Sequence, residues 1–193
     1  MKIAIMGGTF NPIHYGHLIS AEEVYDGLGF NLVIFVPSAR PPHKDNRDII
    51  DPQHRYMMTV LATEDNPHFQ VSRIELDRTG PSYAIETIRQ FQANYGDNAE
   101  IAWIIGADSL IEFTIWKDFD KLLDICRFIA TTRPNYDLSK TPANVYERVE
   151  LFEITAVDIS ATEIRQRIRE GRTIKYLVPK KVEEYIYQHN LYL

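Results

Sequence analysis

The sequence predicts an α/β fold: a doubly wound parallel sheet with a small helical part at its C-terminal end. Short apolar runs rich in Ile and Val, typical of strands buried on both faces, alternate with segments in which apolar residues follow helical spacing. The 193 residues, of which 45% are hydrophobic, suffice for one core. We therefore expect a single domain over residues 1–193, with a helical segment from about residue 160 to 193.

The first two strands are expected at Lys2–Met6 and Leu32–Val36, which are short and almost continuously apolar. A helix is predicted between them, because Leu18, Ala21, Val24, Tyr25 and Leu28 fall at helical spacing. Gly29 is placed to end this helix.

The rest of the chain continues the alternation. A helix is predicted over Asp51–Glu64, where Pro52 suits the first turn, and another over Ser82–Tyr95. The remaining elements, in chain order, are strands at Gln70–Ile74, Ile101–Ile105, Arg127–Thr131 and Glu150–Ile154, then helices at Ala161–Arg169 and from Pro179 onward.

An open parallel sheet binds ligands outside the carboxyl ends of its strands, near a switch in strand order. The loops after Met6, Val36 and Ile105 are therefore where function is expected. These loops hold the most unusual residues of the sequence.

The loop after the first strand reads Gly-Gly-Thr-Phe-Asn-Pro-Ile-His-Tyr-Gly-His. Gly7 and Gly8 allow the backbone to approach a ligand closely, and Thr9 adds a hydroxyl. If the following helix starts near residue 16, His14 and His17 lie at its positive end, which suits a phosphate group. The loop is neither a Walker loop nor a dinucleotide G-x-G-x-x-G pattern. A turn with two surface histidines and a zinc pair are weaker alternatives.

A second unusual segment lies near the other end of the chain. Ser160 and Glu163 have the spacing of a capping box, so they start a helix whatever else they do. Thr162 and Arg165 would lie in its first turns, where unpaired N–H groups attract anions. Arg165 would add a planar fork for phosphate oxygens.

Composition excludes several classes of function. The net charge of −6 argues against a nucleic-acid-binding protein, although basic residues cluster at Arg40–Arg47 and Arg165–Arg172, where small anions would bind. Cys126 is the single cysteine, so we expect neither a disulfide nor a zinc finger. No run is long enough to cross a membrane and no secretory signal is evident, so a cytoplasmic location is expected.

The histidine loop and the Ile-Ser-x-Thr-x-Ile-Arg segment that starts at Ile159 together resemble the two nucleotide-binding motifs of the nucleotidylyltransferase superfamily. The resemblance implies a Rossmann-like fold that binds ATP, with both histidines on the phosphates and the second motif on the β- and γ-phosphates. The ATP contacts it implies are Gly7, Gly8, Thr9, Phe10, His14, His17, Gly106, Asp108, Ile159, Ser160, Thr162 and Arg165.

The middle of the chain narrows the resemblance. The stretches Pro41–Lys44, Asp77–Tyr83 and Gly106–Ser109, followed by Trp116, are similar to those of the bacterial nicotinate-nucleotide adenylyltransferases. Pantetheine-phosphate adenylyltransferases share the first loop but differ here. The likeness covers nearly the whole chain and implies that ATP and nicotinate mononucleotide give nicotinate adenine dinucleotide and pyrophosphate in NAD biosynthesis.

The same resemblance assigns further roles. Catalytic groups would be His14, His17, Lys44 and Arg165, and Mg²⁺ would be carried by the ATP phosphates rather than by a metal site of the chain. The residues expected to bind the mononucleotide are Lys44, Ser82, Tyr83, Ala84, Asp108, Trp116 and Arg133. Three of them have structural alternatives: core packing for Trp116, a helix cap for Asp108 and a surface position for Arg133.

The sequence departs from the family pattern at two positions. Many relatives have Asp where Asn11 stands, so a carboxylate near the phosphates is missing. Relatives often have Thr where Ala84 stands, so a hydroxyl near the nicotinate is missing too. Nicotinamide mononucleotide is therefore an alternative acceptor. A non-catalytic nucleotide-binding regulator is another, although both motifs are intact. The apolar tail suits either its own core or a second copy of the chain, which leaves a homo-oligomer open.

Overall fold

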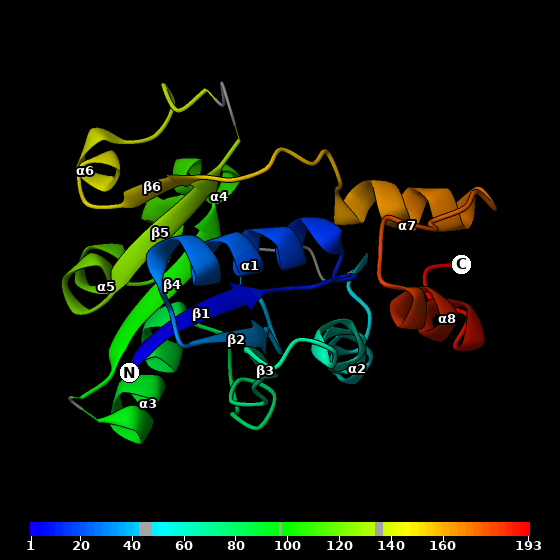
Figure 1. Ribbon diagram of the computed structural model, residues 1–193, viewed down its shortest axis with the longest axis horizontal. Helices are drawn as coiled ribbons and strands as arrows, with labels where there is room; N and C mark the ends of the chain where they lie inside the picture. Colours follow the sequence, from blue (N-terminus) through cyan, green and yellow to red (C-terminus); the bar gives the residue numbers. More distant parts are fainter. Residues whose placement is uncertain (43–47, 97, 134–136) are drawn as a thin grey trace.

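The computed structural model describes residues 1–42, 48–96, 98–133 and 137–193, and these residues form a six-stranded parallel sheet (Figure 1). The strands lie in the order β3-β2-β1-β4-β5-β6. Their bounds are β1 (Lys2–Gly8), β2 (Leu32–Pro37), β3 (Phe69–Val71), β4 (Glu100–Gly106), β5 (Arg127–Thr132) and β6 (Glu150–Glu153).

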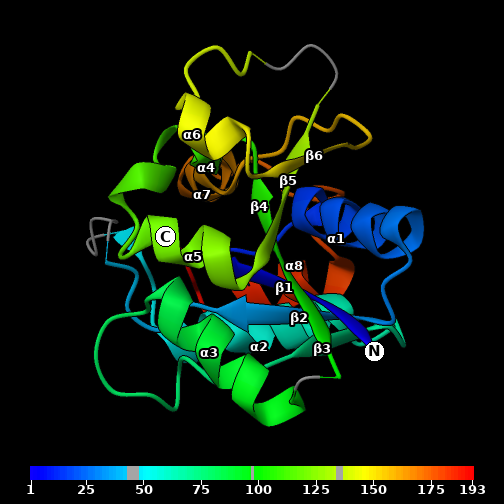
Figure 2. The ribbon, with the colours of Figure 1, turned by 90° about the vertical axis from the view of Figure 1, so that its left-hand side faces the viewer.

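Helices cover both faces of the sheet, and Figure 2 shows α1 and α3 on opposite sides of it. The helices are α1 (Tyr15–Leu28), α2 (Pro52–Thr63), α3 (Ala84–Tyr95), α4 (Asp108–Ile111), the 3₁₀ helix η2 (Phe113–Ile115), α5 (Phe119–Ile125), α6 (Ala143–Tyr146), α7 (Ala161–Arg169) and α8 (Lys180–Gln188). Residues of α1, α2, α7 and α8 pack into one apolar core, and residues of α3 to α6 pack into the other.

The alternation of side chains along β1 separates the two cores. Ala4 and Met6 belong to the core under α1, while Ile3 and Ile5 belong to the core under α3. The strand is buried on both faces, which is why its sequence reads as a continuous apolar run.

The chain reverses its direction of winding at β1. Met6 pairs with a residue of β2 on one side and with Ile104 of β4 on the other, and both neighbours are parallel to β1. The strand order thus places a topological switch point between β1 and β4, which is where a ligand is expected in this architecture.

Most predicted elements are confirmed. Gly29 ends α1 with a φ of 65°, and Asp51 caps α2 by accepting a hydrogen bond from the N–H of Gln53 at 2.7 Å. The third strand was predicted too long: it ends at Val71, because the Ser72 hydroxyl accepts a hydrogen bond from the N–H of Ile74 and turns the chain.

Other predicted bounds need correction. The third helix was predicted from Ser82 but begins at Ala84, since the Ser82 hydroxyl accepts hydrogen bonds from the N–H groups of Ala39 and Arg40 instead. The short helices α4, η2, α5 and α6 were not predicted at all. They have three to seven residues each, too few for an apolar periodicity to show.

The C-terminal helices α7 and α8 lie beyond the end of β1, and α8 packs next to α2 (Figure 1). Leu191 and Tyr192 follow α8 and are each only 8% exposed, so this part of the apolar tail packs on the chain's own core, whereas Tyr187 and Leu193 stay exposed. Among the described residues, no helix has the length and apolar character needed to cross a membrane.

Gly7, at the end of β1, has no room for a larger side chain. A Cβ at this position would lie 2.2 Å from Cζ2 of Trp103 in β4. Trp103 is buried and closely packed, so relieving this overlap requires a shift of its indole ring.

We therefore expect Gly7→Ala to lower the free energy of unfolding by about 1–3 kcal/mol, the usual cost of overpacking. Urea unfolding measures this change. Gly106→Ala is the matched control, because Gly106 ends the neighbouring strand and a Cβ there would meet no atom within 4 Å. Equal stability of the two variants would contradict the argument.

Candidate active site

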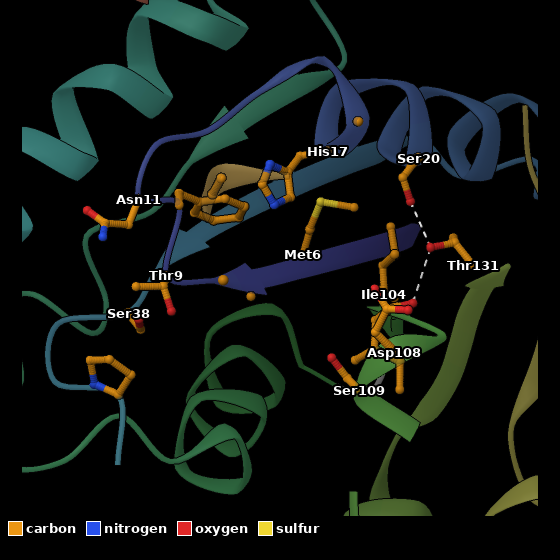
Figure 3. A pocket seen from close by; sticks show the side chains of 18 of the residues that line it. Met6, Thr9, Asn11, His17, Ser20, Ser38, Ile104, Asp108, Ser109 and Thr131 are labelled. Atoms are coloured by element: carbon orange, nitrogen blue, oxygen red, sulfur yellow. Dashed lines mark hydrogen bonds between the residues drawn. The ribbon is translucent and has the colours of Figure 1, made fainter. Parts of the chain in front are cut away.

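A cavity of about 920 Å³ opens at the carboxyl ends of β1 and β4 (Figure 3). In Figure 3 its wall brings together Thr9 from the β1 loop, His17 from α1, Ser38 after β2, and Asp108 after β4. All predicted site residues within the described part of the chain line this cavity. Lys44 lies outside the described residues, so its predicted role stays a prediction.

The glycines of the β1 loop have a packing role in addition to the close approach to a ligand that the sequence predicts. A Cβ on Gly7 would overlap Trp103, and a Cβ on Gly8 would lie 2.8 Å from the ring of Phe10. Packing in the free protein therefore already demands glycine at both positions. Phe10 is itself only 2% exposed, and its ring packs edge-on against His17 with 5.1 Å between centroids. The Phe10 ring therefore supports the imidazole of His17.

The two histidines lie at the start of α1, as predicted. His14 is the N-cap residue, and its backbone N–H donates to Nδ1 of His17 at 3.2 Å. This bond places the proton of a neutral His17 on Nε2, since Nδ1 acts as acceptor. The two rings lie 3.8 Å apart at an angle of 31°.

Burial sets the charge of the His14 imidazole. The side chain is 7% exposed, and burial, aided by the nearby Arg133, lowers its pKa to about 4. His14 is thus neutral at pH 7 in the free protein. A neutral imidazole at a helix N-terminus still serves as a hydrogen-bond donor.

The second motif starts α7. The Ser160 hydroxyl accepts a hydrogen bond from the N–H of Glu163 at 3.2 Å, which confirms half of the predicted capping box. The other half is wrong, because the Glu163 carboxylate binds Arg167 at 2.7 Å instead of returning to the backbone. Thr162 and Arg165 both line the cavity, as the phosphate-binding interpretation requires.

The two motifs, far apart in sequence, meet in space. Nη1 of Arg165 donates to the backbone carbonyl of Asn11 at 2.9 Å. A Cβ on Gly16, in the first turn of α1, would lie 3.7 Å from the carbonyl oxygen of Ile159. The N-termini of α1 and α7 are therefore neighbours, and the free N–H groups of both helices border the same cavity.

Asn11 takes part in the framework of the site. It is 6% exposed, and its Nδ2 donates to the carbonyl of Asp48 at 2.8 Å. Its Oδ1 accepts from the N–H of Ile50 at 3.4 Å and from the hydroxyl of Tyr192 at 3.0 Å. An amide can satisfy all three partners because it both donates and accepts, whereas a carboxylate cannot donate to Asp48.

Most of the second basic cluster is neutralised. The partners of Arg167, Arg169 and Arg172 are, respectively, Glu163 at 2.7 Å, Asp48 at 3.2 Å and Glu170 at 3.0 Å. Within the described ranges no carboxylate lies within ion-pair distance of Arg165, so its charge faces the cavity. The predicted anion site is thus a single arginine, not the whole cluster. Of the first cluster, only residues 40–42 lie in the described part.

Asp108 and Trp116 lie on the β4 side of the cavity. Asp108 does not cap α4, because Ala107 is the N-cap and Asp108 is the first residue of the helix. Its carboxylate is exposed at the cavity wall. Trp116 is half-buried, with its ring 5.1 Å from that of Phe113, so the ring packs on the core and borders the cavity at once.

The start of α3 forms another part of the wall. Tyr83 is the N-cap residue and Ala84 the first helical residue, and no side chain caps the helix there. Nζ of Lys117 lies 4.1 Å above the ring of Tyr83 and 3.1 Å from a carboxylate oxygen of Glu86. Ser82 lines the cavity as predicted, but its hydroxyl fixes the loop after β2.

Arg133, just after β5, borders the cavity and lies close enough to His14 to lower the pKa of that imidazole. Its Nη1 binds the carboxylate of Asp158 at 3.1 Å. Asp158 is almost fully exposed, so this pair is readily exchanged for another anion.

Two buried charged residues near the cavity were missed from the sequence. Arg55 has no solvent exposure and donates to the carbonyl of Thr9 at 2.7 Å. Glu75 accepts a hydrogen bond from the Thr87 hydroxyl at 2.6 Å, and burial raises the pKa of its carboxyl group. A sequence gives no sign that a particular arginine or glutamate is buried, since most of them are exposed.

Unsatisfied polar atoms concentrate around the cavity. Hydrogen-bond partners are missing, within the described part of the chain, for the buried atoms His14 Nδ1, Ser38 Oγ, Glu75 Oε2, Trp103 Nε1, Thr141 Oγ1 and Arg165 Nε. All of these residues except Thr141 line the cavity. Native proteins leave few buried groups unpaired, so these atoms are available to bind ordered water or a polar ligand in the cavity.

Neither a metal cluster nor a thiol nucleophile stands out. Over the described ranges, no group of three or more His, Cys, Asp or Glu residues is placed to hold a metal ion. Cys126 is 8% exposed, and burial raises the pKa of its thiol to about 12, so the thiolate is not formed at neutral pH.

Known proteins resemble this chain over nearly its whole length. Residues 5–167 match the cytidylyltransferase-like family. The chain is 46% identical to a probable nicotinate-nucleotide adenylyltransferase of Moorella thermoacetica, over 99% of this chain and 91% of the relative. It is 45% identical to a protein of the same description from Thermoanaerobacter, over 100% of this chain and 94% of the relative.

Solved structures share the fold. A Plasmodium falciparum nicotinic acid mononucleotide adenylyltransferase complexed with NaAD gives a TM-score of 0.81 at 18% identity, covering 99% of this chain and 97% of that one. A putative nicotinate-nucleotide adenylyltransferase from Vibrio parahaemolyticus gives 0.71 at 22% identity, covering 99% and 94%.

The buried imidazole of His14 makes folding depend on pH. Its pKa is about 4 in the folded protein and near the ordinary 6.5 when unfolded, so between these values the unfolded chain binds more protons. The stability that the neutral His14 contributes to the folded protein is fully present above pH 6.5 and is lost as the pH falls toward 4.

We expect this residue alone to remove about 2 kcal/mol of stability between pH 7 and pH 5. Urea unfolding at both pH values, compared with His14→Gln, measures the effect. The variant should show a correspondingly smaller loss, and an equal loss in both proteins would contradict the argument.

Proposed function

The chain belongs to the cytidylyltransferase-like family and, within it, to the nicotinate-nucleotide adenylyltransferases, and from that premise we propose how its residues divide the work. The chain transfers the adenylyl group of ATP to nicotinate mononucleotide, which gives nicotinate adenine dinucleotide and releases pyrophosphate. This is a nucleotidyltransferase reaction of NAD biosynthesis.

One observation supports the assignment of the site most directly. Arg165 of the second motif bonds to the backbone of the first-motif loop at Asn11, 154 positions away. The histidines and the arginine therefore act on one ligand in one cavity. The two motifs are separate patterns in the sequence, but in the fold they form a single anion site.

The mechanism is direct in-line displacement. The 5′-phosphate of nicotinate mononucleotide attacks the α-phosphorus of ATP, a P–O bond forms, and the bond to pyrophosphate breaks. The attacking phosphate monoester is already ionised at pH 7, so no general base is required. Catalysis consists of orientation, which supplies about 7–11 kcal/mol in favourable cases, and of stabilising charge on the phosphates.

The phosphate side of the site is formed by the N-termini of α1 and α7. His14 and His17 donate hydrogen bonds to phosphate oxygens, while Thr162 and Arg165 bind the oxygens that leave with pyrophosphate. The backbone of Gly7–Phe10 and of Ile159 and Ser160 borders the same ligand. Gly106 and Asp108 lie against the ribose, and the carboxylate of Asp108 accepts hydrogen bonds from the ribose hydroxyl groups.

The nicotinate side is formed by α3 and the segment around Trp116. The indole stacks on the pyridine ring, and the uncapped N-terminus of α3 at Tyr83 and Ala84 receives the carboxylate. The ammonium group of Lys117 lies over Tyr83 and favours an acid over an amide. Ser82 acts by holding the loop, and Arg133 exchanges Asp158 for the mononucleotide phosphate.

Mg²⁺ fits this donor set as a companion of ATP. The described cavity wall offers scattered carboxylates rather than a cluster of ligands, which suits an ion held chiefly by phosphate oxygens. When bound, Mg²⁺ neutralises phosphate charge.

Several wider expectations stay predictions. We treat residues 1–193 as one domain because Arg165 of α7 bonds to the β1 loop and α8 packs on α2. The net charge of −6 argues against nucleic acid as a partner. A cytoplasmic location, homo-oligomers and a role for Lys44 remain to be tested.

The first test is pyrophosphate release from ATP and Mg²⁺, with nicotinate mononucleotide and nicotinamide mononucleotide compared at equal concentration. We expect the acid to be preferred. His17→Ala should lower kcat by about 10²–10³, the usual effect of removing one preorganised donor.

His17→Asn is the control for folding. The Asn oxygen replaces Nδ1 as the acceptor from the His14 N–H, so it keeps the start of α1 but loses the distal donor. It should be as stable as the wild type and as slow as His17→Ala. A folded His17→Ala protein with normal kcat would sink the assignment of this residue.

Lys117 carries the prediction on selectivity. Lys117→Met should reduce the ratio of kcat/KM for acid over amide by about two- to fivefold, because a half-exposed charge contributes up to ~1 kcal/mol. Lys121→Met is the matched control, since Lys121, like Lys117, is ion-paired, in this case with Asp118, but does not border the cavity. An unchanged ratio in Lys117→Met would assign selectivity to the backbone of α3 alone.

A further inference from the structure

Tyr192, which follows α8, reaches into the framework of the phosphate site. Its hydroxyl lies 3.0 Å from Oδ1 of Asn11, 181 positions away in the sequence, and the contact is buried. Tyr192 is 8% exposed and adopts a φ of 67°, so its backbone lies in the left-handed region that favours glycine. The surrounding packing holds the side chain there.

The hydroxyl of Tyr192 acts as the donor in this bond. Burial raises the pKa of Tyr192, against smaller opposing effects from Arg165 and Arg55, so the hydroxyl stays protonated. Oδ1 of Asn11 is an acceptor, and it also receives the N–H of Ile50. The two donors, together with the bond from Nδ2 to the carbonyl of Asp48, fix the plane of the amide.

The backbone of Asn11 holds one arm of Arg165. Its carbonyl oxygen accepts from Nη1 at 2.9 Å, and the other arm reaches the Thr162 hydroxyl at 3.4 Å. Neither partner is charged, and in the described part of the chain no carboxylate lies within ion-pair distance of this guanidinium. The direction in which Arg165 presents its fork thus depends on where the Asn11 carbonyl stands.

We infer that Tyr192 and the side chain of Asn11 are positioning residues that aim Arg165 at the phosphates of ATP. The inference rests on the proposed function, in which Arg165 binds those phosphates. The hydroxyl of Tyr192 fixes the side-chain amide of Asn11. The fixed side chain holds the backbone carbonyl of Asn11 in place, and this carbonyl orients the guanidinium of Arg165. The segment after α8 is thereby part of the phosphate site without touching the ligand.

Tyr192→Phe tests this inference because it removes the hydroxyl and little else. Loss of one neutral hydrogen bond should lower kcat/KM for ATP about three- to tenfold and raise the Kd for ATP, measured by calorimetry, by a similar factor. Tyr185→Phe is the matched control, since the Tyr185 hydroxyl also ties α8 to the body of the protein, through His54 at 2.9 Å, but reaches no phosphate ligand. The control should lose thermal stability yet keep kcat/KM within twofold.

A double-variant cycle then separates positioning from stability. Arg165→Lys keeps the charge but loses the fork that the Asn11 carbonyl holds. In that background Tyr192→Phe should change kcat/KM by less than twofold, while its effect on thermal stability should persist.

Four outcomes would count against us, and they are distinguishable. Full additivity with Arg165→Lys, or equal effects of Tyr192→Phe and Tyr185→Phe on kcat/KM, would overturn the inference alone. A wild-type protein without pyrophosphate release, or an Arg165→Lys variant with unchanged kcat/KM, would overturn the proposed function of the site and the inference with it.

Discussion

Arg55 donates hydrogen bonds to the carbonyl oxygens of Thr9, Ile50 and Ala39 at 2.7, 3.0 and 3.4 Å from a position without solvent exposure. Burial lowers its pKa to about 10, so it remains a cation at neutral pH. A buried charge costs several kcal/mol unless its hydrogen bonds are satisfied, and here three carbonyls satisfy them. The loops after β1 and β2 and the start of α2 are thereby joined, and the proposed phosphate site is built on these joined segments.

A phosphate site also needs positive charge that the protein does not cancel itself. Arg167 and Arg169 have carboxylate partners, whereas Arg165 is held by a backbone carbonyl and a hydroxyl. Held in this way, the guanidinium keeps its charge for a ligand and still has a defined direction. Neutral hydrogen bonds thus position Arg165. A carboxylate in an ion pair with Arg165 would instead compete with the phosphate for the guanidinium.

The sequence allowed the sheet, its main helices and the cavity residues to be predicted, because these follow from local patterns. Apolar runs reveal strands buried on both faces, and motif spacing places His17 and Arg165 at helix starts. What local patterns cannot reveal is pairing across the fold. The demand of Trp103 for glycine at position 7, the partners of Asn11 and the burial of Arg55 all depend on residues far away in the chain. The short helices after β4 were missed because one or two turns carry no periodicity.

Several polar groups at the cavity lie in an unfavourable environment that a bound ligand would improve. His14 is desolvated until it is neutral, and Nε of Arg165 and Oγ of Ser38 are buried without partners in the described part of the chain. A buried polar group without a protein partner costs stability, yet none of these groups needs to reorganise when a charged phosphate arrives. Preorganisation and stability are therefore opposed at this edge of the sheet. The joined loops around Arg55 and the packed segment after α8 are what make the arrangement stable enough to persist without its ligand.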